Sequence, residues 1–439
     1  MARQRSWADS TSLKTIARAA AGLPAPRVTR VRSLIELKVD SIEHCSATIT
    51  TMPMGYVATT ALLAWCTFFA VVAPRRPRPL ATLSFWFGLI LNEVPFVGIY
   101  VLVASTALAA AQGDLDSTGA KVTAAVAAVA TIGLALSAWQ GLRTKQVVGR
   151  ALEEGLGTGW RDRVHVPLRR HRPWARILLL PVLMRRRDVH RIPNISYGDA
   201  GRRNLLDIYR RRDAPQNAPV LIYFHGGGYA SGAKNREARP LLYRLADQGW
   251  VCISANYRLR PQTTFPGHQI DAKKVIAWVR EHASEHGADP SRLFVAGSSA
   301  GSNMAALCAL TPNNPMFQPG FESADTSVTA AICLYGYYGH YFGDPPDEPP
   351  PPLQPQGYIH RGAPPFLIAH GAKDTLGTVE GARNFVAQLR RASESTVVYA
   401  ELPGGQHSFD VYHSPRFEAV VDGVEAFAAW ILATPAGSE

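Results

Sequence analysis

The chain has 439 residues, 47% hydrophobic and 18% charged, and its 46 Lys and Arg outnumber its 34 Asp and Glu to give a net charge of +12. This apolar fraction excludes an intrinsically disordered chain. The five cysteines, no two of which have the C-x-x-C spacing, exclude a disulfide scaffold and a four-cysteine zinc module.

The excess positive charge is confined to the N-terminal part of the chain. Residues 1–141 carry a net charge of +5, residues 142–192 carry +9, and residues 193–439 carry −2. A nucleic-acid-binding globule instead carries its basic residues over the face that contacts phosphates. We therefore expect no nucleic-acid partner. We assign the basic residues to anchoring at the membrane and to setting the orientation of the spans.

Three long apolar runs predict a multi-pass membrane protein with about three spans. Tyr56–Ala73 and Val122–Leu142 carry no charge, and each matches the ~20 residues that a helix needs to cross a bilayer. Leu80–Ala111 carries only Glu93 and is too long for one upright span but too short for two. We expect it to form one span that is tilted or kinked at Pro95.

The charges of the loops predict the orientation of these spans. The loops after the first and third runs each carry three basic residues, namely Arg75, Arg76 and Arg78 in one and Arg143, Lys145 and Arg150 in the other. The loop after the second run carries Asp114 and Asp116. Because positive loops stay inside, we expect a cytoplasmic C-terminal half and an outer N-terminus. Residues 1–30 lack the apolar core of a signal peptide, so we expect none.

Two features of this region each allow two interpretations. Glu93 is either part of a proton or transport path or a residue near the headgroups beside the Pro95 kink. We favour the second, because the sequence shows no basic partner for it. Trp174–Met184, with arginines on both sides, is either an interfacial helix on anionic lipid or a helix packed on the soluble domain.

From about residue 195, β-rich runs alternate with helical patterns. The predicted strands are Leu205–Tyr209, Val220–Phe224, Trp250–Asn256, Leu293–Ala296, Val328–Tyr335, Phe366–Ala369 and Val397–Leu402. The predicted helices are Glu237–Gln248, Gln269–His286, Ala300–Leu310, Val379–Arg391 and Arg416–Leu432. Such alternation predicts a mostly parallel, doubly wound α/β sheet. We divide the chain into an N-terminal arm (1–54), an all-α transmembrane region (55–142), a basic juxtamembrane linker or lid segment (143–194) and a catalytic domain (195–435).

A G-x-S-x-G motif follows one apolar strand and opens a helix. It consists of Gly297, Ser298, Ser299, Ala300 and Gly301. The flanking glycines permit a cramped turn that holds the Ser299 hydroxyl out of the sheet at a helix N-terminus. Ser299 is therefore the candidate nucleophile.

A second motif follows the strand Val220–Phe224. It consists of His225, Gly226, Gly227 and Gly228. Glycines let backbone N–H groups approach an oxyanion with no Cβ in the way. We expect Gly226 and Gly227 to supply two donors and Ala300 the third. A phosphate loop is excluded because no Gly-Lys-Ser/Thr follows.

The candidate acid and base follow two later strands. Asp374 lies in the loop after one, and His407 lies in a Gly-rich loop after the last. The order serine, aspartate, histidine along the chain is that of α/β-hydrolases. His413 and His370 are the nearest rivals for the base, and Glu380 is the rival acid.

Residues ~195–435 resemble the hormone-sensitive-lipase-like branch of α/β-hydrolase esterases, in which His-Gly-Gly-Gly precedes G-x-S-A-G. Three further stretches resemble that branch: Asn256-Tyr257-Arg258-Leu259, Ala288-Asp289-Pro290-Ser291-Arg292 and His370-Gly371-x-x-Asp374. With the apolar runs added, the chain is similar to membrane-anchored actinobacterial carboxylesterases of the Lip group. It departs from the branch at Ser298, where Asp is usual, and at Ser302, where Gly is often found. The resemblance implies an α/β-hydrolase fold and ester hydrolysis by Ser299, Asp374 and His407.

These features together predict a membrane-anchored serine carboxylesterase or lipase that forms an acyl-enzyme and needs no metal or organic cofactor. We expect a lipid-like or apolar-acyl ester as substrate, because the anchor places the enzyme where such esters partition. Aromatic residues at 335–342 beside the prolines of 345–355 form either a lid or a surface loop. The alternatives are an amidase, deacetylase or peptidase on the same triad, and a catalytically silent, membrane-tethered binding protein.

Overall fold

The computed structural model describes residues 53–164, 172–213, 215–338 and 353–434. Its contacts divide the chain into two compact units, one of residues 1–61 and 104–127 and the other of residues 62–103 and 128–439. Nearly all of the predicted N-terminal arm and most of the proline-rich stretch lie outside the described residues. The catalytic candidates all belong to the second unit.

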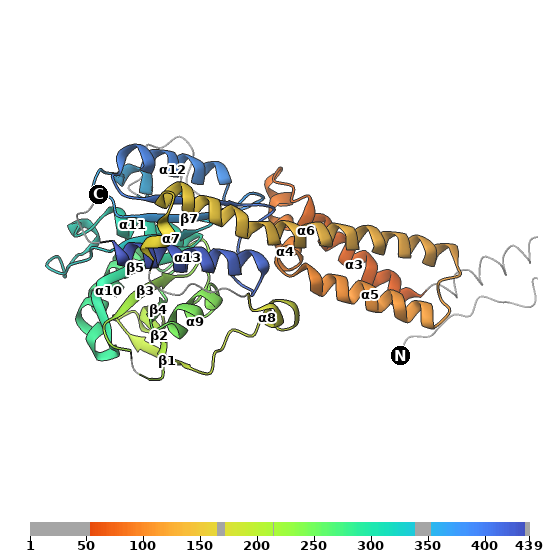
Figure 1. Cartoon of the computed structure of the whole chain (residues 1–439), viewed down its shortest axis with the longest axis horizontal. Helices are drawn as coiled ribbons and strands as arrows, with labels where there is room; N and C mark the ends of the chain where they lie inside the picture. The colour runs from red at the N-terminus through yellow and green to blue at the C-terminus, as the bar shows by residue number, and fades with distance from the viewer. Residues whose placement is uncertain (1–52, 165–171, 214, 339–352, 435–439) are drawn as a thin grey trace, which may run out of the picture. The chain divides into compact units, whose positions relative to one another are not determined.

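The three apolar runs form four helices in the described part of the chain (Figure 1). These are α3 (Met54–Val71), α4 (Arg78–Glu93), α5 (Pro95–Ala111) and α6 (Thr118–Leu156). By length and composition, α3 and α6 are each able to cross a membrane, and α4 and α5 qualify together as a pair bent by 82°. Of its two expected forms, the second run has the bend at Pro95 and is not one tilted, unbroken helix. It breaks at Val94, because Pro95 has no N–H with which to continue the hydrogen bonding of α4.

The rest of the described chain folds around one eight-stranded sheet. Its strands are β1 (Val189–Ser196), β2 (Leu205–Arg211), β3 (Ala218–Phe224), β4 (Val251–Ala255), β5 (Ala288–Ser298), β6 (Ala330–Leu334), β7 (Phe366–Gly371) and β8 (Val397–Leu402). The spatial order is β1-β2-β4-β3-β5-β6-β7-β8, with β2 antiparallel to both β1 and β4 and all other pairs parallel. The predicted mostly parallel α/β sheet is confirmed.

Helices cover both faces of this sheet. The longer ones are α9 (Arg239–Asp247), α10 (Gly267–His282), α11 (Ala300–Leu310), α12 (Val379–Ala392) and α13 (Pro415–Ala433), and two short ones, α7 (Trp160–Arg163) and α8 (Trp174–Leu179), precede the sheet. Short 3-10 turns occur at Gly201–Asn204, Ala283–His286, Pro315–Phe317 and Pro355–Tyr358. Val220 and Ile222 of β3 pack in one core cluster with α10, α11 and α12, whereas Leu221 and Tyr223 pack in the other with α9 and α13. The central strand is apolar throughout because both of its faces are covered.

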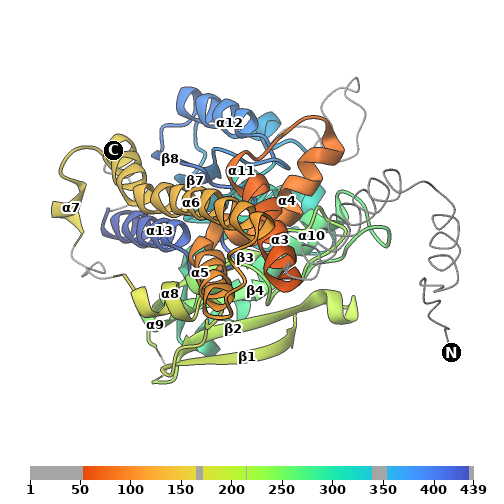
Figure 2. The ribbon, with the colours of Figure 1, turned by 90° about the vertical axis from the view of Figure 1, so that its right-hand side faces the viewer.

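The sheet begins earlier than the predicted domain boundary at residue 195. Figure 2 shows β1 and β2 together at one edge of the sheet. The pairing of β1 with β2 shifts register between Ile192 and Ile195, and Pro193 lies in the gap. A bulge and a proline on an edge strand hide the period-two pattern that would reveal a strand in the sequence.

The C-terminal part of α6 packs into the α/β domain and runs beyond its predicted end at Leu142. Its buried residues in one core cluster are Val148, Ala151, Leu152 and Leu156. Two glycines allow the close approach. A Cβ at Gly155 would lie 2.7 Å from Val398 Cγ2, and a Cβ at Gly423 would lie 2.5 Å from Val148 Cγ1. The first residues of the predicted linker thus belong to the hydrophobic core.

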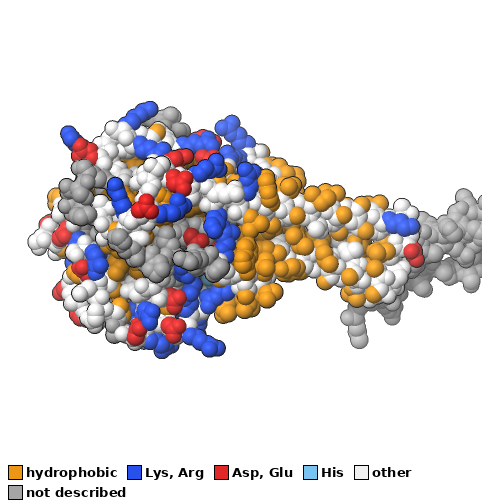
Figure 3. Space-filling view, viewed as in Figure 1, with side chains coloured by type: hydrophobic (Ala, Val, Ile, Leu, Met, Phe, Trp, Pro, Cys, Tyr) orange, Lys and Arg blue, Asp and Glu red, His pale blue; other side chains and the backbone are white. Residues whose placement is uncertain are grey.

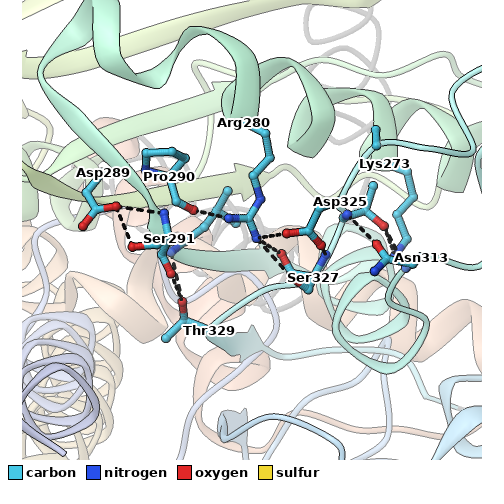
Figure 4. A network of polar contacts seen from close by, with 12 residues as sticks. Lys273, Arg280, Asp289, Pro290, Ser291, Asn313, Asp325, Ser327 and Thr329 are labelled. Carbon is cyan, nitrogen blue, oxygen red and sulfur yellow. Dashed lines mark hydrogen bonds and ion pairs between the residues drawn. The ribbon is translucent and has the colours of Figure 1, made fainter. Parts of the chain in front are cut away.

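A polar network ties α10 to the loop before β6 (Figure 4). Arg280 donates to the carbonyl of Ser327 at 2.8 Å and pairs with Asp325 at 3.0 Å. Lys273, on the same helix, is buried and donates to the carbonyl of Cys308 at 3.2 Å. Burial lowers the pKa of Lys273 to about 8. These contacts hold α10 in place and lie apart from the candidate site.

Candidate active site

Ser299 lies on the tight turn between β5 and α11. Its φ of 55° falls in the left-handed region, which is strained for a residue with a side chain. The neighbouring glycines are sterically required. A Cβ at Gly297 would lie 2.1 Å from the carbonyl oxygen of Gly301, and a Cβ at Gly301 would lie 2.0 Å from that of Phe224. The turn holds the Ser299 hydroxyl at the N-terminus of α11.

His407 lies between Ser299 and Asp374. Its Nε2 is 2.9 Å from Ser299 Oγ, and its Nδ1 is 2.7 Å from Asp374 Oδ2. The other oxygen of Asp374 accepts the backbone N–H groups of Leu376 at 2.9 Å and Gly377 at 2.8 Å. The structure therefore brings the three predicted residues together, with His407 between Ser299 and Asp374.

The environment of Asp374 keeps its carboxyl group ionised. Burial raises the pKa of Asp374, but the charge of His407 and hydrogen bonds from His370 and His407 lower it more. The resulting pKa lies well below the ordinary value. An ionised Asp374 holds the proton of the imidazole on Nδ1 and leaves Nε2 of His407 able to accept one.

The rival residues have other partners. His370 Nε2 lies 2.8 Å from the carbonyl oxygen of Gly377 and 3.3 Å from Asp374 Oδ2, on the side of the acid. His413 pairs with Glu418. Glu380 is exposed and lies 3.6 Å from Arg75. In the part of the chain that the structure describes, none of these three rivals contacts Ser299.

Gly226 does not face the site as expected. Its N–H donates to Glu237 Oε2 at 2.6 Å and is therefore not available to an oxyanion. The next two residues, Gly227 and Gly228, have φ angles of 115° and 59° and line the cavity at Ser299 together with Ala300. The glycines that line the cavity beside Ser299 are thus Gly227 and Gly228, one residue further along the chain than the expected Gly226 and Gly227.

His225 supports the glycine loop from behind. Its ring is buried and stacks on Tyr257 with 4.4 Å between the ring centroids. The Tyr257 hydroxyl donates to the His225 carbonyl at 2.8 Å. Burial lowers the pKa of His225 to about 4, so its imidazole is neutral at physiological pH. Its contacts are those of a scaffold residue.

Two buried carboxylates near the site were missed in the sequence. Asp410, three residues after His407, accepts hydrogen bonds from Ser298 Oγ at 2.6 Å and from the Tyr223 hydroxyl at 3.3 Å. Burial raises the pKa of Asp410, and burial together with the charge of Asp410 raises the pKa of Glu237 to about 7. The signal in the sequence was the departure at Ser298, where the branch usually has Asp, since the hydroxyl of Ser298 binds Asp410.

A cavity of about 220 Å³ opens at Ser299. Its aromatic and aliphatic lining residues are Phe85, Trp86, Tyr229, Tyr337 and Leu376. Phe85 and Trp86 belong to α4, and the ring of Phe85 lies 5.9 Å from that of His407. The sequence did not point to them, because they lie in a run with the composition of a membrane span. Among the described residues, no group of three or more His, Cys, Asp or Glu is arranged to hold a metal ion.

The C-terminal end of α4 contacts the loop that carries His407. Asn92 Nδ2 donates to the carbonyl of Gly404 at 2.9 Å, and Asn92 Oδ1 accepts the N–H of Gln406 at 3.2 Å. Glu93 forms a buried ion pair with Arg416. The sequence shows no basic partner for Glu93, and on that point the interpretation is wrong, because Arg416 is its partner. Its partner lies 323 positions away in the sequence, where no local pattern reveals it.

The chain is similar to carboxylic ester hydrolases over most of its length. A family model described as BD-FAE matches residues 206–339. The probable carboxylic ester hydrolase LipM of Mycobacterium tuberculosis is 39% identical over 406 residues, which cover 82% of this chain and 91% of LipM. The chain belongs to the Lip-group carboxylic ester hydrolases.

Two further Lip-group relatives come from the same organism. Esterase LipQ is 38% identical over 70% of this chain and 80% of its own length, and esterase LipC is 38% identical over 56% and 66%. These relatives confirm the predicted resemblance and the reaction class, carboxylic ester hydrolysis. The match to LipM covers 82% of the chain, whereas residues 195–439 make up only about 56% of it. The similarity to LipM therefore extends into the N-terminal helices.

Proposed function

We propose that this chain is a membrane-anchored serine carboxylesterase in which Ser299, His407 and Asp374 act as nucleophile, general base and orienting acid. The observation that carries the proposal is the contact of 2.9 Å between Ser299 Oγ and His407 Nε2. A serine hydroxyl at that distance from an imidazole oriented by a carboxylate is able to pass on its proton as it attacks.

The reaction runs in two halves. His407 Nε2 takes the proton of Ser299 as Oγ attacks the ester carbonyl carbon, and Asp374 stabilises the imidazolium. The imidazolium then gives that proton to the leaving alkoxide, which departs as an alcohol and leaves the acyl group on Ser299. His407 then takes a proton from water as the water oxygen attacks the acyl carbonyl carbon. The bond from that carbon to Ser299 Oγ breaks, His407 returns the proton to Oγ, and the acid leaves.

The backbone N–H groups of Gly227, Gly228 and Ala300 are the donors we assign to the tetrahedral oxyanion. All three residues line the cavity at Ser299, whereas the N–H of Gly226 is bound by Glu237. Each donor of this kind is worth roughly 2.7–4 kcal/mol in the transition state. The N-terminus of α11 adds a favourable dipole at the same place.

Apolar side chains on the outside of the N-terminal helices support the membrane anchor. Trp65, Trp86 and Ile132 have 50%, 61% and 62% of their surface exposed. Figure 3 shows hydrophobic side chains gathered over these helices. A helix that faces water carries polar residues on its outer face, whereas lipid accepts apolar ones. Arg143 stacks on Trp139 at 4.6 Å, a pairing suited to the interface.

The segment around α8 supports contact with anionic lipid. Leu179 and Val182 have 71% and 66% of their surface exposed, while Ile177 is buried against Val94 and Phe96. A cavity nearby is lined by five arginines, namely Arg185, Arg186, Arg187, Arg191 and Arg212. Both interpretations of this segment contribute, since one side packs on protein and the other offers apolar and cationic groups to headgroups.

The proposal is tested with purified full-length protein and p-nitrophenyl esters. We expect hydrolysis by the wild type, loss of it in Ser299→Ala, and labelling of Ser299 by a fluorophosphonate probe. Full activity of Ser299→Ala would refute the nucleophile. A matched anilide separates the amidase alternative, because we expect the ester to react much faster. A wild type that neither hydrolyses esters nor reacts with the probe would favour the silent binding protein.

A further inference from the structure

Helix α4 has two apolar faces with different surroundings. One face is buried and includes Ala81, Phe85 and Gly88. The other face exposes Leu83, Trp86 and Ile90, with 42%, 61% and 50% of their surface accessible. Residues spaced by three and four lie on one side of a helix, so these form a continuous apolar stripe.

This stripe starts at the cavity that holds Ser299. Phe85 and Trp86 line the cavity from α4, and Gly227, Gly228 and Ser299 line it from the α/β domain. Trp86 is both a lining residue and largely exposed, so it stands at the mouth of the cavity. Phe85 lies deeper, beside the ring of His407. The cavity therefore opens from the reacting serine onto the apolar stripe of α4.

Hydrogen bonds hold α4 in register with both catalytic loops. Thr375, next to Asp374, donates its hydroxyl to the carbonyl of Ala81 at 3.0 Å. Asn92, at the other end of the helix, binds the carbonyl of Gly404 and the N–H of Gln406 just before His407. A helix fixed at both ends to these loops is a permanent wall of the cavity.

We propose that α4 is the specificity-determining wall of the active site and that the substrate is a lipophilic ester whose apolar chain lies along α4. The inference rests on the proposed esterase function. The ester carbonyl sits at Ser299, the first part of the chain passes Phe85, and the remainder leaves the cavity past Trp86. Because the exposed stripe of α4 suits lipid, such an ester enters from the bilayer without crossing water.

The experiment compares chain-length preference between wild type and Trp86→Ala. Two series are used, p-nitrophenyl butyrate against decanoate and ethyl butyrate against decyl butyrate, with the protein in detergent or nanodiscs. In one of the two series, we expect the ratio of kcat/KM for the long ester to kcat/KM for the short ester to fall by about tenfold in Trp86→Ala. A loss of this size corresponds to two methylene groups that no longer have an apolar contact. The preference is the ratio of kcat/KM for the long ester to that for the short ester in the same variant, so a general loss of activity in Trp86→Ala cancels.

The matched control is Trp139→Ala on α6. Trp139 is about as exposed as Trp86, at 52%, but it does not line the cavity, so its replacement should leave the preference unchanged. An unchanged preference in Trp86→Ala, or an equal loss in Trp139→Ala, would overturn the inference. Failure of the underlying esterase proposal looks different, because the wild type would then be inactive on every ester and Ser299 would not be labelled.

Discussion

Glu237 and Asp410 show how buried side chains decide the roles of their neighbours. Glu237 binds the N–H of Gly226, which leaves Gly227 and Gly228 as the glycines of this loop that line the cavity. Asp410 accepts the hydroxyl of Ser298, the residue before the nucleophile. Neither carboxylate touches Ser299 Oγ or His407 in the described contacts. Glu237 holds the backbone of the glycine loop, and Asp410 holds the side chain of Ser298.

At this scale we expect Asp374→Asn to lower kcat for a p-nitrophenyl ester by about 10⁴-fold while the protein remains folded. The amide leaves the geometry in place but donates to Nδ1 of His407, which puts the imidazole proton on Nε2 and removes the base. The measurement is steady-state hydrolysis together with a thermal melt. The control is Glu380→Gln, since Glu380 is exposed and its ion-pair partner is Arg75. A mild loss in Asp374→Asn would contradict the assigned acid.

The pKa of Glu237 predicts a pH dependence of stability. Its folded-state value of about 7 exceeds the ordinary 4.5, so between these values the folded protein holds a proton that the unfolded chain releases. The contribution of Glu237 to stability therefore falls as pH rises from 4.5 to 7 and stays level above. Glu237→Gln keeps an acceptor for Gly226 without the ionisation. We expect its thermal midpoint to decline less than that of the wild type across this window, and parallel declines would contradict the cause.

At the scale of elements, the break between α4 and α5 connects the apolar helices to the catalytic loops. Pro95 ends the hydrogen bonding of α4, and the bend of 82° leaves Asn92 and Glu93 at the end of the helix. There they meet the loop before His407 and the start of α13, where Ser414 donates to Glu93 at 2.7 Å.

We expect Glu93→Gln to destabilise the protein by about 3–5 kcal/mol, because it leaves Arg416 buried without its countercharge. The double variant Glu93→Gln with Arg416→Met should lose less than the sum of the two single losses, and kcat should fall with stability as the His407 loop shifts. Thermal and denaturant unfolding measure the losses of stability, and steady-state ester hydrolysis measures kcat.

The control for this cycle is Arg361→Gln, which breaks an exposed ion pair with Glu394. Surface pairs contribute little, so we expect the melting curve to stay close to that of the wild type. Strictly additive losses at Glu93 and Arg416 would show that the pair is not coupled.

At the scale of the whole molecule, the hydrolase domain is not separable from the helices before it. The core of the α/β domain includes Val148, Leu152 and Leu156 of α6, and the wall of its cavity comes from α4. Cutting the chain at the predicted boundary of 195 would remove β1 and these helices and expose the sheet edge and core. The apolar helix α6 and the α/β domain here share one hydrophobic core.

The loop charges predict that the α/β domain faces the cytoplasm, with the turn between α5 and α6 on the opposite side. In intact cells we expect Asp114→Cys to react with a membrane-impermeant thiol reagent, and a fluorescent protein fused after residue 439 to fluoresce in the cytoplasm. The parent chain provides the control for labelling of its own cysteines. Labelling at residue 114 only after cell lysis, or an active periplasmic reporter at the C-terminus, would reverse the orientation.

The sequence by itself determined the parts of this protein that depend on local spacing. The G-x-S-x-G turn, the glycine run after β3, the order of Ser299, Asp374 and His407, and the apolar helices are all encoded within short windows, because steric and periodic patterns act between near neighbours. Only the tertiary structure decided which glycines face the cavity, what pairs with Glu93, and that α4 lines the site. These depend on contacts between segments up to 323 positions apart, for which a local pattern carries no signal.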